Sequence, residues 1–326
     1  MAKPLSSLQQ AYLLGRSEQW PLGGVAMHDF RVFRGRLDPQ RFCQRLSELV
    51  DYFAALRTVI DVEKQQQSVL PALQPHLEQI DLTLLSAQEA EHQVNQLRHR
   101  YQQIRHDPAL PPWKIILVAL PEENEYCVLT SFDALILDGQ GISRIIARLF
   151  DEQPLNAMPT HLPTVEPFTS AITREEAKSW WQEKLNGAVT PSRLPWLTPF
   201  ADIATPKWRR ESKTLEAGSL KKLLRLGAAQ GLFANTVLSV IVLDTLALWA
   251  DDETLLVGVP TVFPSYEQQL VNRSTFFAVR YHRAGELEEN AQTLQADILT
   301  GLQNLAWSGV DLARQLVPCK DRKSVV

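Results

Sequence analysis

The stretch that decides the fold of this chain is residues 126–150, YCVLTSFDALILDGQGISRIIARLF. It opens with an apolar run that predicts a buried strand, and this strand ends at Asp133. A second carboxylate, Asp138, follows five positions later, after four apolar residues. Gly139 and Gly141 then lead into apolar residues at helical spacing, namely Ile142, Ile145, Ile146 and Leu149. The pattern predicts a strand, a turn and a helix, a common way to place polar groups at a site.

The two carboxylates have two interpretations at this point. In the first, Asp133 leaves the strand into solvent and Asp138 caps the following helix. In the second, both side chains face a functional site at the end of the strand. The spacing alone does not separate these interpretations, so the rest of the chain has to decide between them.

Length and composition describe an ordinary globular protein. The 326 residues suffice for two domains, and 45% are hydrophobic and 21% charged. A net charge of −4 without a basic stripe gives no electrostatic case for nucleic acid or an anionic membrane, so neither is expected as a partner. The first ten residues lack the apolar core of a signal peptide, and the longest apolar region, 236–250, is too short to span a bilayer. Three distant cysteines and seven scattered histidines show no metal-ligand spacing. These features predict a soluble, cytoplasmic, metal-free protein.

Capping signals predict where the helices of the first half begin. Asp38 before Pro39 marks one helix start, and residues 86–89 form a capping box that opens another helix. A short helix is expected at residues 4–14 and ends at Gly15. Strands are expected at residues 24–35, with a bulge, at 56–62, at 113–120 and at 125–132, the last two joined as a hairpin.

The second half also mixes helices with strands. Four prolines in residues 151–173 predict a linker, so we expect domains at 1–172 and 173–326. A capping box opens a helix at Thr173, and Ser219 is expected to cap another. Residues 236–249 are apolar nearly all round and predict a buried helix. The other expected elements are strands at 208–215, 255–259 and 276–281, a helix at 286–305 and an unstructured tail from 318.

Residues 4–16, PLSSLQQAYLLGR, resemble the opening motif of heterocyclization domains of nonribosomal peptide synthetases. In these relatives of condensation domains, two aspartates five apart replace the two-histidine motif, and Asp133 and Asp138 match that replacement. His28 ahead of FRG, PPWKI at 111–115 and WWQEKL at 180–185 also resemble the family. The resemblance covers about residues 4–318 and is stronger in the first half.

The resemblance implies a mixed α/β (α+β) fold of two chloramphenicol-acetyltransferase-like lobes in a V. It implies a domain of peptide or siderophore assembly that joins a carrier-bound acyl group to carrier-bound cysteine, serine or threonine, with thiazoline or oxazoline formation. The resemblance also implies that the domain binds no cofactor directly, that it works with the phosphopantetheine arms of carrier proteins, and that its partners are carrier and adenylation domains. The site residues carried over are Asp133 and Asp138 as catalytic and Tyr12, Arg16 and Gly139 as substrate-binding.

The chemistry of ring closure suggests different roles for the two carboxylates. Attack of an amine on a thioester requires positioning and a stabilised carbonyl oxygen, and expulsion of water also requires proton transfer. Asp133, at the end of a strand, is expected either to contact substrate or to be structural. Asp138, among apolar neighbours, is expected to form an ion pair, with Arg57 and Arg280 as candidate partners.

Several positions depart from the family pattern. Gly141 stands where the family usually has a serine, and Tyr52-Phe53 stands where an arginine-histidine pair is expected. The second-lobe motif is altered at residues 264–266 and 272–275. The family continues beyond the end of this sequence with a threonine and a late aspartate that serve ring closure, so we expect the second lobe to be incomplete.

Other reactive residue types have structural explanations. Trp180, Trp181, Trp196 and Trp208 are expected to pack, and Cys127 stands within a strand without an acid–base pair. Ser308 lacks the strand context of a nucleophile and is expected in a turn. Four histidines on or near the polar helix of the first half are expected to be solvated, namely His76, His92, His99 and His106.

Three functions remain open. The first is a heterocyclization-type domain acting on carrier-bound thioesters. The second is a non-catalytic condensation-like module that docks carriers or scaffolds a synthetase. The third is a simple acyltransferase of the same fold, which Ala134 argues against because that chemistry uses a histidine base at this position.

Overall fold

The computed structural model describes residues 2–20, 22–151, 155, 171–185, 194–203, 211–250, 253–263 and 270–316. The chain divides into two compact units. Unit 1 consists of Met1–Glu166 and Ser265–Arg273, and unit 2 consists of Pro167–Pro264 and Ser274–Val326. The return of Ser265–Arg273 to unit 1 is not evident from the sequence pattern, and the division expected at 172/173 stays a prediction.

Unit 1 is built on a four-stranded sheet with the order β2-β7-β6-β5. Strands β2 (His28–Arg36), β7 (Glu125–Asp133) and β6 (Trp113–Ala119) are antiparallel, and β5 (Glu78–Asp81) runs parallel to β6. The predicted β6–β7 hairpin is confirmed. The predicted bulge in the first strand is wrong, since β2 pairs with β7 without interruption from His28 to Arg36.

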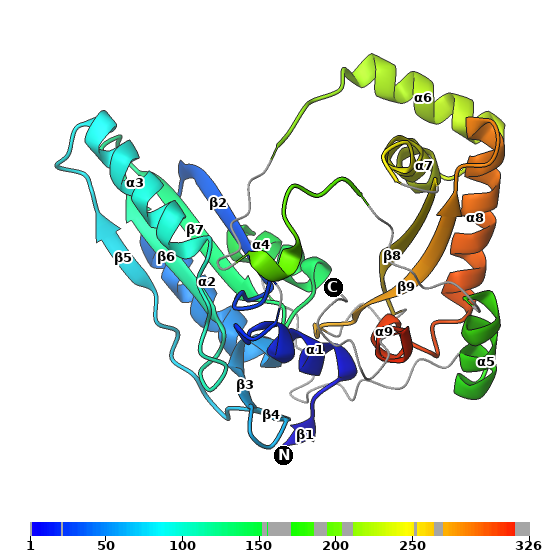
Figure 1. The fold of residues 1–326 in the computed structure, drawn as a ribbon. Helices are drawn as coiled ribbons and strands as arrows, with labels where there is room; N and C mark the ends of the chain where they lie inside the picture. The colour runs from blue at the N-terminus through cyan, green and yellow to red at the C-terminus, as the bar shows by residue number, and fades with distance from the viewer. Residues whose placement is uncertain are drawn as a thin grey trace. The chain divides into compact units, whose positions relative to one another are not determined.

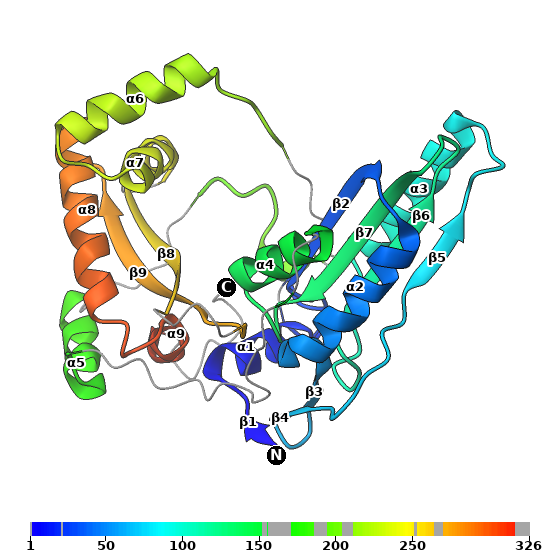
Figure 2. The same ribbon diagram turned by 180° about the vertical axis from the view of Figure 1, so that it is seen from behind.

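Two helical layers cover this sheet (Figures 1 and 2). Helices α2 (Pro39–Tyr52) and α4 (Gly139–Phe150) pack on one face, and α3 (Ala87–Tyr101) packs on the other. The predicted helix starts are confirmed, because Asp38 caps α2 and the Ser86–Glu89 capping box opens α3. Alternate residues of β7 therefore face different helices, and Asp133 lies on the same face as Cys127 and Leu129, which α3 covers.

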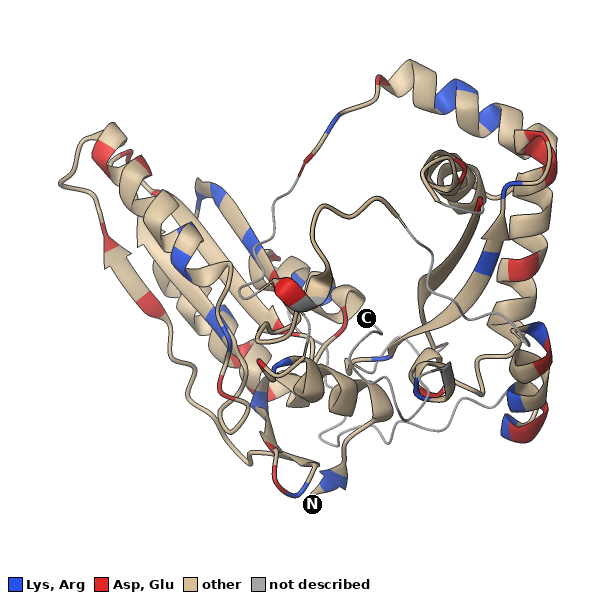
Figure 3. Ribbon diagram, viewed as in Figure 1, with Lys and Arg blue, Asp and Glu red and all other residues tan. Residues whose placement is uncertain are grey.

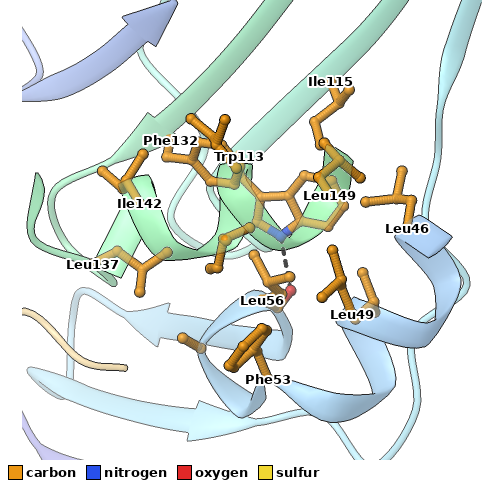
Figure 4. Packing of buried hydrophobic residues seen from close by; sticks show 14 of the residues in the cluster. Leu46, Leu49, Phe53, Leu56, Trp113, Ile115, Phe132, Leu137, Ile142 and Leu149 are labelled. Carbon is orange, nitrogen blue, oxygen red and sulfur yellow. Dashed lines mark hydrogen bonds between the residues drawn. The ribbon is translucent and has the colours of Figure 1, made fainter. Parts of the chain in front are cut away.

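The core under α2 and α4 is centred on Trp113 (Figure 4). Its indole Nε1 donates a hydrogen bond of 2.8 Å to the main-chain oxygen of Leu56, in the 3₁₀ helix η1 (Ala54–Arg57). Phe132 stacks near it with ring centroids 6.3 Å apart, and Leu49 and Leu137 are fully buried in the same cluster. Because Leu137 lies between the two aspartates, the core itself holds one side of their turn.

The N-terminal segment completes unit 1. Helix α1 (Ser7–Gly15) follows β1 (Lys3–Pro4), which pairs with β4 (Gln66–Val69) and, through it, with β3 (Thr58–Asp61). Ser6 and Gln9 form a capping box at the start of α1. The sequence pattern placed this helix correctly but not the strand pairing around it.

Unit 2 contains a two-stranded antiparallel sheet among its described residues, formed by β8 (Thr254–Val262) and β9 (Ser274–His282). Its other elements are α5 (Arg174–Lys184), η2 (Phe200–Asp202), α6 (Ala217–Ala229), α7 (Ala234–Ala247), α8 (Leu287–Gln303) and α9 (Gly309–Leu316). The capping box at Thr173 is confirmed. The cap expected at Ser219 is wrong, because α6 begins two residues earlier.

Helix α7 is less buried than its composition predicts. Val237, Val240 and Ala247 are in the core of unit 2, whereas Leu238 and Val242 are exposed. The prediction of a fully buried helix is therefore wrong for α7. No described helix alone has the length and hydropathy to cross a membrane; α6 and α7 together meet that criterion, but they bend by 104° at their break.

Some sequence predictions concern residues outside the described part of the chain. These are most of the proline-rich segment 151–173, the motif at 264–266, the tail from 318, and Trp208. The expected strand 208–215 is described only from Glu211, and residues 211–215 have no strand there. Positions of Lys and Arg and positions of Asp and Glu are interspersed along the described ribbon of both units (Figure 3).

Candidate functional site at the two-aspartate turn

Asp133 is the last residue of β7, and Asp138 is the N-cap of α4. The turn between them is buried at Leu135, Ile136 and Leu137, which pack into two different clusters of unit 1. Asp133 is only 1% exposed and Asp138 only 6%. The expected cap at Asp138 is confirmed, whereas the interpretation that Asp133 leaves the strand into solvent is wrong.

Asp133 forms a buried ion pair with Arg16, which follows α1. The Arg16 Nη2 donates to Oδ2 of Asp133, while the other carboxylate oxygen accepts from the main-chain N–H of Leu135 at 2.9 Å. Burial raises the pKa of Asp133, and the Arg16 guanidinium opposes this shift. Two of the predicted site residues, 117 positions apart, are thus bound to each other.

Asp138 uses both of its carboxylate oxygens. Oδ1 accepts from the N–H of Gly141 at 2.8 Å, and Oδ2 accepts from the main-chain N–H of Arg273 at 3.2 Å. Burial lowers the pKa of the Arg273 guanidinium, and the nearby Asp138 opposes that shift. Arg273, which belongs to unit 1, is therefore the arginine beside Asp138.

Of the two arginines predicted from the sequence as partners of Asp138, Arg57 is wrong, and Arg280 stays a prediction. Arg57 donates to four main-chain oxygens, those of Val50, Asp51, Leu70 and Pro71. Arg280 lies in β9 of unit 2, opposite Leu256. The guanidinium of Arg57 is thus used to close the loops around η1.

The opening motif also holds the main chain of the turn. Gln9 donates through Nε2 to the oxygen of Leu135 at 2.7 Å, and Asn272 donates through Nδ2 to the oxygen of Ala134. The hydroxyl of Tyr12 is hydrogen-bonded to Asn272, and burial raises its pKa. Tyr12 also packs against the cluster that contains Leu5, Ile60 and Leu135. The two motifs that carry the family resemblance therefore form one structure.

Gly139 and Gly141 have different surroundings. Gly139 is the exposed first residue of α4, and a Cβ added there meets no atom within 4 Å. A Cβ at Gly141 would lie 3.1 Å from Leu137 Cδ2 and 3.5 Å from Asp138 Oδ1. Packing thus explains the small residue at 141 but not at 139. Substrate binding by Gly139 stays a prediction.

Three residues around Asp133 were not predicted as site residues, although His28 was part of the family resemblance. The imidazole Nε2 of His106 is hydrogen-bonded to the hydroxyl of Ser131 at 2.8 Å, and His28 lies edge-on to His106 with ring centroids 6.5 Å apart. Burial lowers the pKa of His106 to about 4. The prediction that His106 is solvated is wrong. It is confirmed for the exposed residues His76, His92 and His99.

The alternation of β7 could have pointed to Ser131. Ser131 precedes Asp133 by two positions, so both side chains lie on the same face of the strand. His28 pairs directly with Asp133 in the register of β2 and β7. The position of His106 in a loop after α3 carries no comparable signal.

The other residues that were set aside have structural roles. Burial raises the pKa of the Cys127 thiol, which disfavours the nucleophilic thiolate. Ser308 accepts from the N–H of Asp311 at 3.2 Å and so begins α9. Trp181 is in the core of unit 2, as expected, whereas Trp196 is exposed and packs against Phe200. Among the described residues, no group of three or more potential metal ligands lies together.

Comparison with known proteins identifies the family. The condensation-domain model matches residues 4–262. The chain belongs to the condensation-domain family. Among solved structures, the cyclization-docking bidomain of EpoB from Sorangium cellulosum has a TM-score of 0.84 at 18% identity and covers 97% of this chain and 66% of its own. The first condensation domain of the CDA synthetase has a TM-score of 0.72 at 16% identity, with 98% and 80% covered.

Curated relatives are synthetases of far greater length. Bacitracin synthase 1 of Bacillus licheniformis is 25% identical over 96% of this chain and 6% of its own length. Pyochelin synthetase PchE of Pseudomonas aeruginosa is 29% identical over 78% of this chain and 18% of its own. Phenyloxazoline synthase MbtB of Mycobacterium sp. is 24% identical, with 96% and 28% covered.

These matches confirm the predicted relationship to condensation domains and the mixed α/β condensation-domain fold of chloramphenicol-acetyltransferase type. The chain is a condensation-type domain of the nonribosomal peptide synthetase class, a class that works with the phosphopantetheine arms of carrier proteins. Because the chain spans between 6% and 28% of the relatives described above, their complete activities are not transferred to it.

Proposed function

We propose that this condensation-type domain joins a carrier-bound acyl group to carrier-bound cysteine, serine or threonine and then closes a thiazoline or oxazoline ring. The observation that carries the proposal is the pair Asp133 and Asp138 at the turn between β7 and α4, held by the opening motif through Arg16. Two similar proteins have names that point the same way, the phenyloxazoline synthase MbtB and the EpoB cyclization-docking bidomain.

The reaction has two stages. In the first, the amine of the acceptor amino acid attacks the donor thioester, an amide forms and the donor phosphopantetheine thiol leaves. In the second, the side-chain thiol or hydroxyl attacks the new amide carbonyl, and the carbonyl oxygen leaves as water after proton transfer. Both stages depend on holding the reacting groups together, which contributes on the order of 7–11 kcal/mol in well-oriented systems.

The contacts at the turn suggest how Asp133 and Asp138 contribute. Each carboxylate is buried and bound within unit 1, and the turn between them is held at three main-chain oxygens or N–H groups by other segments. We assign their first role to shaping this turn. Burial raises the pKa of Asp133, and a carboxyl group with a raised pKa can act as a general acid or base. The proposal therefore includes a catalytic role for Asp133.

One observation favours a second function, a non-catalytic module that docks carriers within a synthetase. Both motif carboxylates already have partners inside unit 1, with Arg16 on Asp133 and main-chain N–H groups on Asp138. A turn that is satisfied internally could serve as a scaffold alone. The two functions differ in whether an acyl group is transferred from the donor carrier to the acceptor carrier.

The deciding experiment is intact-protein mass spectrometry of a reconstituted reaction. It contains this chain, an acyl-loaded donor carrier and a cysteine-loaded acceptor carrier. Heterocyclization predicts that the acceptor gains the acyl mass and then loses the mass of one water. Transfer without loss of water would leave a condensing domain and contradict ring closure.

Variants connect the result to the turn. Asp133→Asn and Asp138→Asn are compared with Glu123→Gln, an exposed residue of the β6–β7 connection. We expect transfer to fall by at least ~10-fold in both aspartate variants and to stay unchanged in the control. Absence of transfer from a chain shown by circular dichroism to be folded would support the scaffold function.

A further inference from the structure

A polar cluster lies on the α3 side of the sheet of unit 1, beyond the end of that helix. Helix α3 covers this face at Leu129 and Cys127 and ends at Tyr101. Further along the same face of β7 come Ser131 and Asp133. Residues 102–112, which connect α3 to β6, pass over them, and we call this segment the 102–112 loop.

The 102–112 loop touches the surroundings of Asp133 at three places. The main-chain oxygen of Pro112 accepts from the N–H of Asp133 at 2.9 Å. The main-chain oxygen of His106 accepts from Nη1 of Arg16 at 2.9 Å, and the His106 side chain is bonded to Ser131. Arg16 is therefore fixed between two acceptors, one on the loop and one on Asp133.

His106 is the residue that ties these contacts together. Its side chain anchors the loop to β7 through Ser131, two positions before Asp133. Its main chain presents the oxygen that holds Arg16. Without the hydrogen bond to Ser131, the 102–112 loop could shift, and the main-chain oxygen of His106 would move away from Arg16. The guanidinium would then be held by Asp133 without its second acceptor.

Burial is the main cause of the lowered pKa of His106. The neighbouring basic groups of His28 on β2, Arg16 and Lys114 on β6 add to this effect, so the neutral imidazole is favoured. A neutral imidazole adds no positive charge beside Arg16, so the guanidinium remains the cation that Asp133 binds.

We propose that His106 is a positioning residue which, through Ser131 and its own main-chain oxygen, holds Arg16 against Asp133 and so fixes the two-aspartate turn. Its effect on catalysis rests on the proposed function, whereas its effect on Asp133 does not. No part of the family resemblance identified this residue.

The test compares His106→Ala with His106→Gln, whose amide can replace Nε2 as a partner of Ser131. His99→Ala is the matched control, because His99 is exposed on α3. The first readout is the titration of the Asp133 carboxyl carbon by NMR of protein labelled with ¹³C-aspartate. We expect its midpoint to rise by about one pH unit in His106→Ala and to return in His106→Gln.

The second readout is the rate of acyl transfer. We expect kcat to fall by ~10-fold in His106→Ala while KM for the acceptor carrier stays within about twofold, since the turn is misplaced but not removed. Rescue by His106→Gln separates positioning from a general loss of packing, and thermal unfolding shows whether each variant is folded.

The proposal is overturned if Asp133 titrates in folded His106→Ala as it does in the natural chain. If His106→Ala does not fold, Ser131→Ala removes the same side-chain contact with a smaller change and is subject to the same criterion. If the natural chain transfers no acyl group, the proposed function fails, while the Asp133 titration still decides the role of His106.

Discussion

Two regions of this molecule place a carboxylate among arginine, tyrosine and asparagine, with opposite results. In unit 1, Asp133 binds Arg16, and Tyr12 and Asn272 lie beside its turn. In unit 2, Asp244 of α7 accepts from Tyr281 at 2.9 Å, from Arg283 at 3.1 Å and from Asn290 at 3.1 Å. The same residue types surround both carboxylates, but the hydrogen bonds are distributed differently.

The difference appears in the pKa. Three side-chain donors lower the pKa of Asp244 against the effect of burial, whereas burial prevails at Asp133 and raises its pKa. The side chain of Asp244 is 19% exposed and that of Asp133 only 1%. Asp244 is thus a satisfied connection between α7, β9 and α8. Asp133 is a buried carboxyl group that forms an ion pair with Arg16, and a buried ion pair is more sensitive to loss of one partner.

The largest predicted effect follows from removing that cation. Arg16→Met would leave the Asp133 carboxylate buried without its partner, and such a change typically costs about 3–5 kcal/mol. We expect unit 1 to be destabilised by this amount in urea unfolding and transfer activity to be lost. The double variant Arg16→Met with Asp133→Leu should recover most of the stability but not the activity. Equal stability of the single variant and the natural chain would contradict the buried ion pair.

Asp244→Ala should have the next largest effect. Three donors would lose their acceptor, although partial exposure reduces the cost, and we expect a loss of about 2–3 kcal/mol. Hydrogen exchange should accelerate in α7 and in the start of α8. Exposed Glu288 of α8 provides the control, Glu288→Ala. If exchange in unit 1 accelerates as much as in α7, Asp244 is not the local connection that its contacts indicate.

The local sequence pattern was sufficient to predict the secondary structure of the two-aspartate turn, but not the residues that contact it. Strand, cap and helix around Asp138 follow from short-range rules, and the structure confirms them. The partners are Arg16 and the main-chain N–H of Arg273, which are distant in the sequence. No spacing pattern in a single sequence indicates that these residues contact Asp133 or Asp138. The proposal of Arg57 failed because its guanidinium is satisfied by nearby carbonyl groups, a loop geometry that no spacing rule describes.

Burial was predicted least well where a side chain's neighbours are distant in sequence. His106 follows a polar helix and was assigned to solvent, yet the loop carries it onto Ser131. Helix α7 was assigned to the core because its composition is apolar on all sides, yet one side remains exposed. Composition measures what a helix can bury, and tertiary packing decides how much of it is buried.

The pH dependence of stability provides a third test. The folded state lowers the pKa of His106 from 6.5 to about 4, so the unfolded chain binds the proton more tightly between these values. Stability should therefore be complete above pH 6.5 and fall as the pH decreases toward 4, by about 1–2 kcal/mol after allowance for partial exposure. His106→Gln should remove this part of the dependence. Urea midpoints at pH 7, 6, 5 and 4 measure it, and parallel curves for both proteins would contradict a buried neutral imidazole.

The smallest predicted effects come from the two glycines of the turn. At Gly139, an added Cβ meets nothing, so Gly139→Ala should stabilise α4 by about 0.5 kcal/mol through the lower backbone entropy of the unfolded chain. At Gly141, the same gain is opposed by the contact with Leu137 at 3.1 Å, and we expect a change between zero and a loss of about 1 kcal/mol.

The rate of acyl transfer in these variants then shows whether each glycine contacts substrate or only allows close packing. If Gly139 lies against substrate, Gly139→Ala should lower the rate of transfer in a protein that is more stable than the natural chain. If it does not, the rate should be unchanged, and Gly139 drops out of the site. Gly141→Ala changes both quantities together when it displaces Leu137 and the cap at Asp138. The pair therefore shows whether the turn is sensitive on its substrate side or only on the side that faces the core.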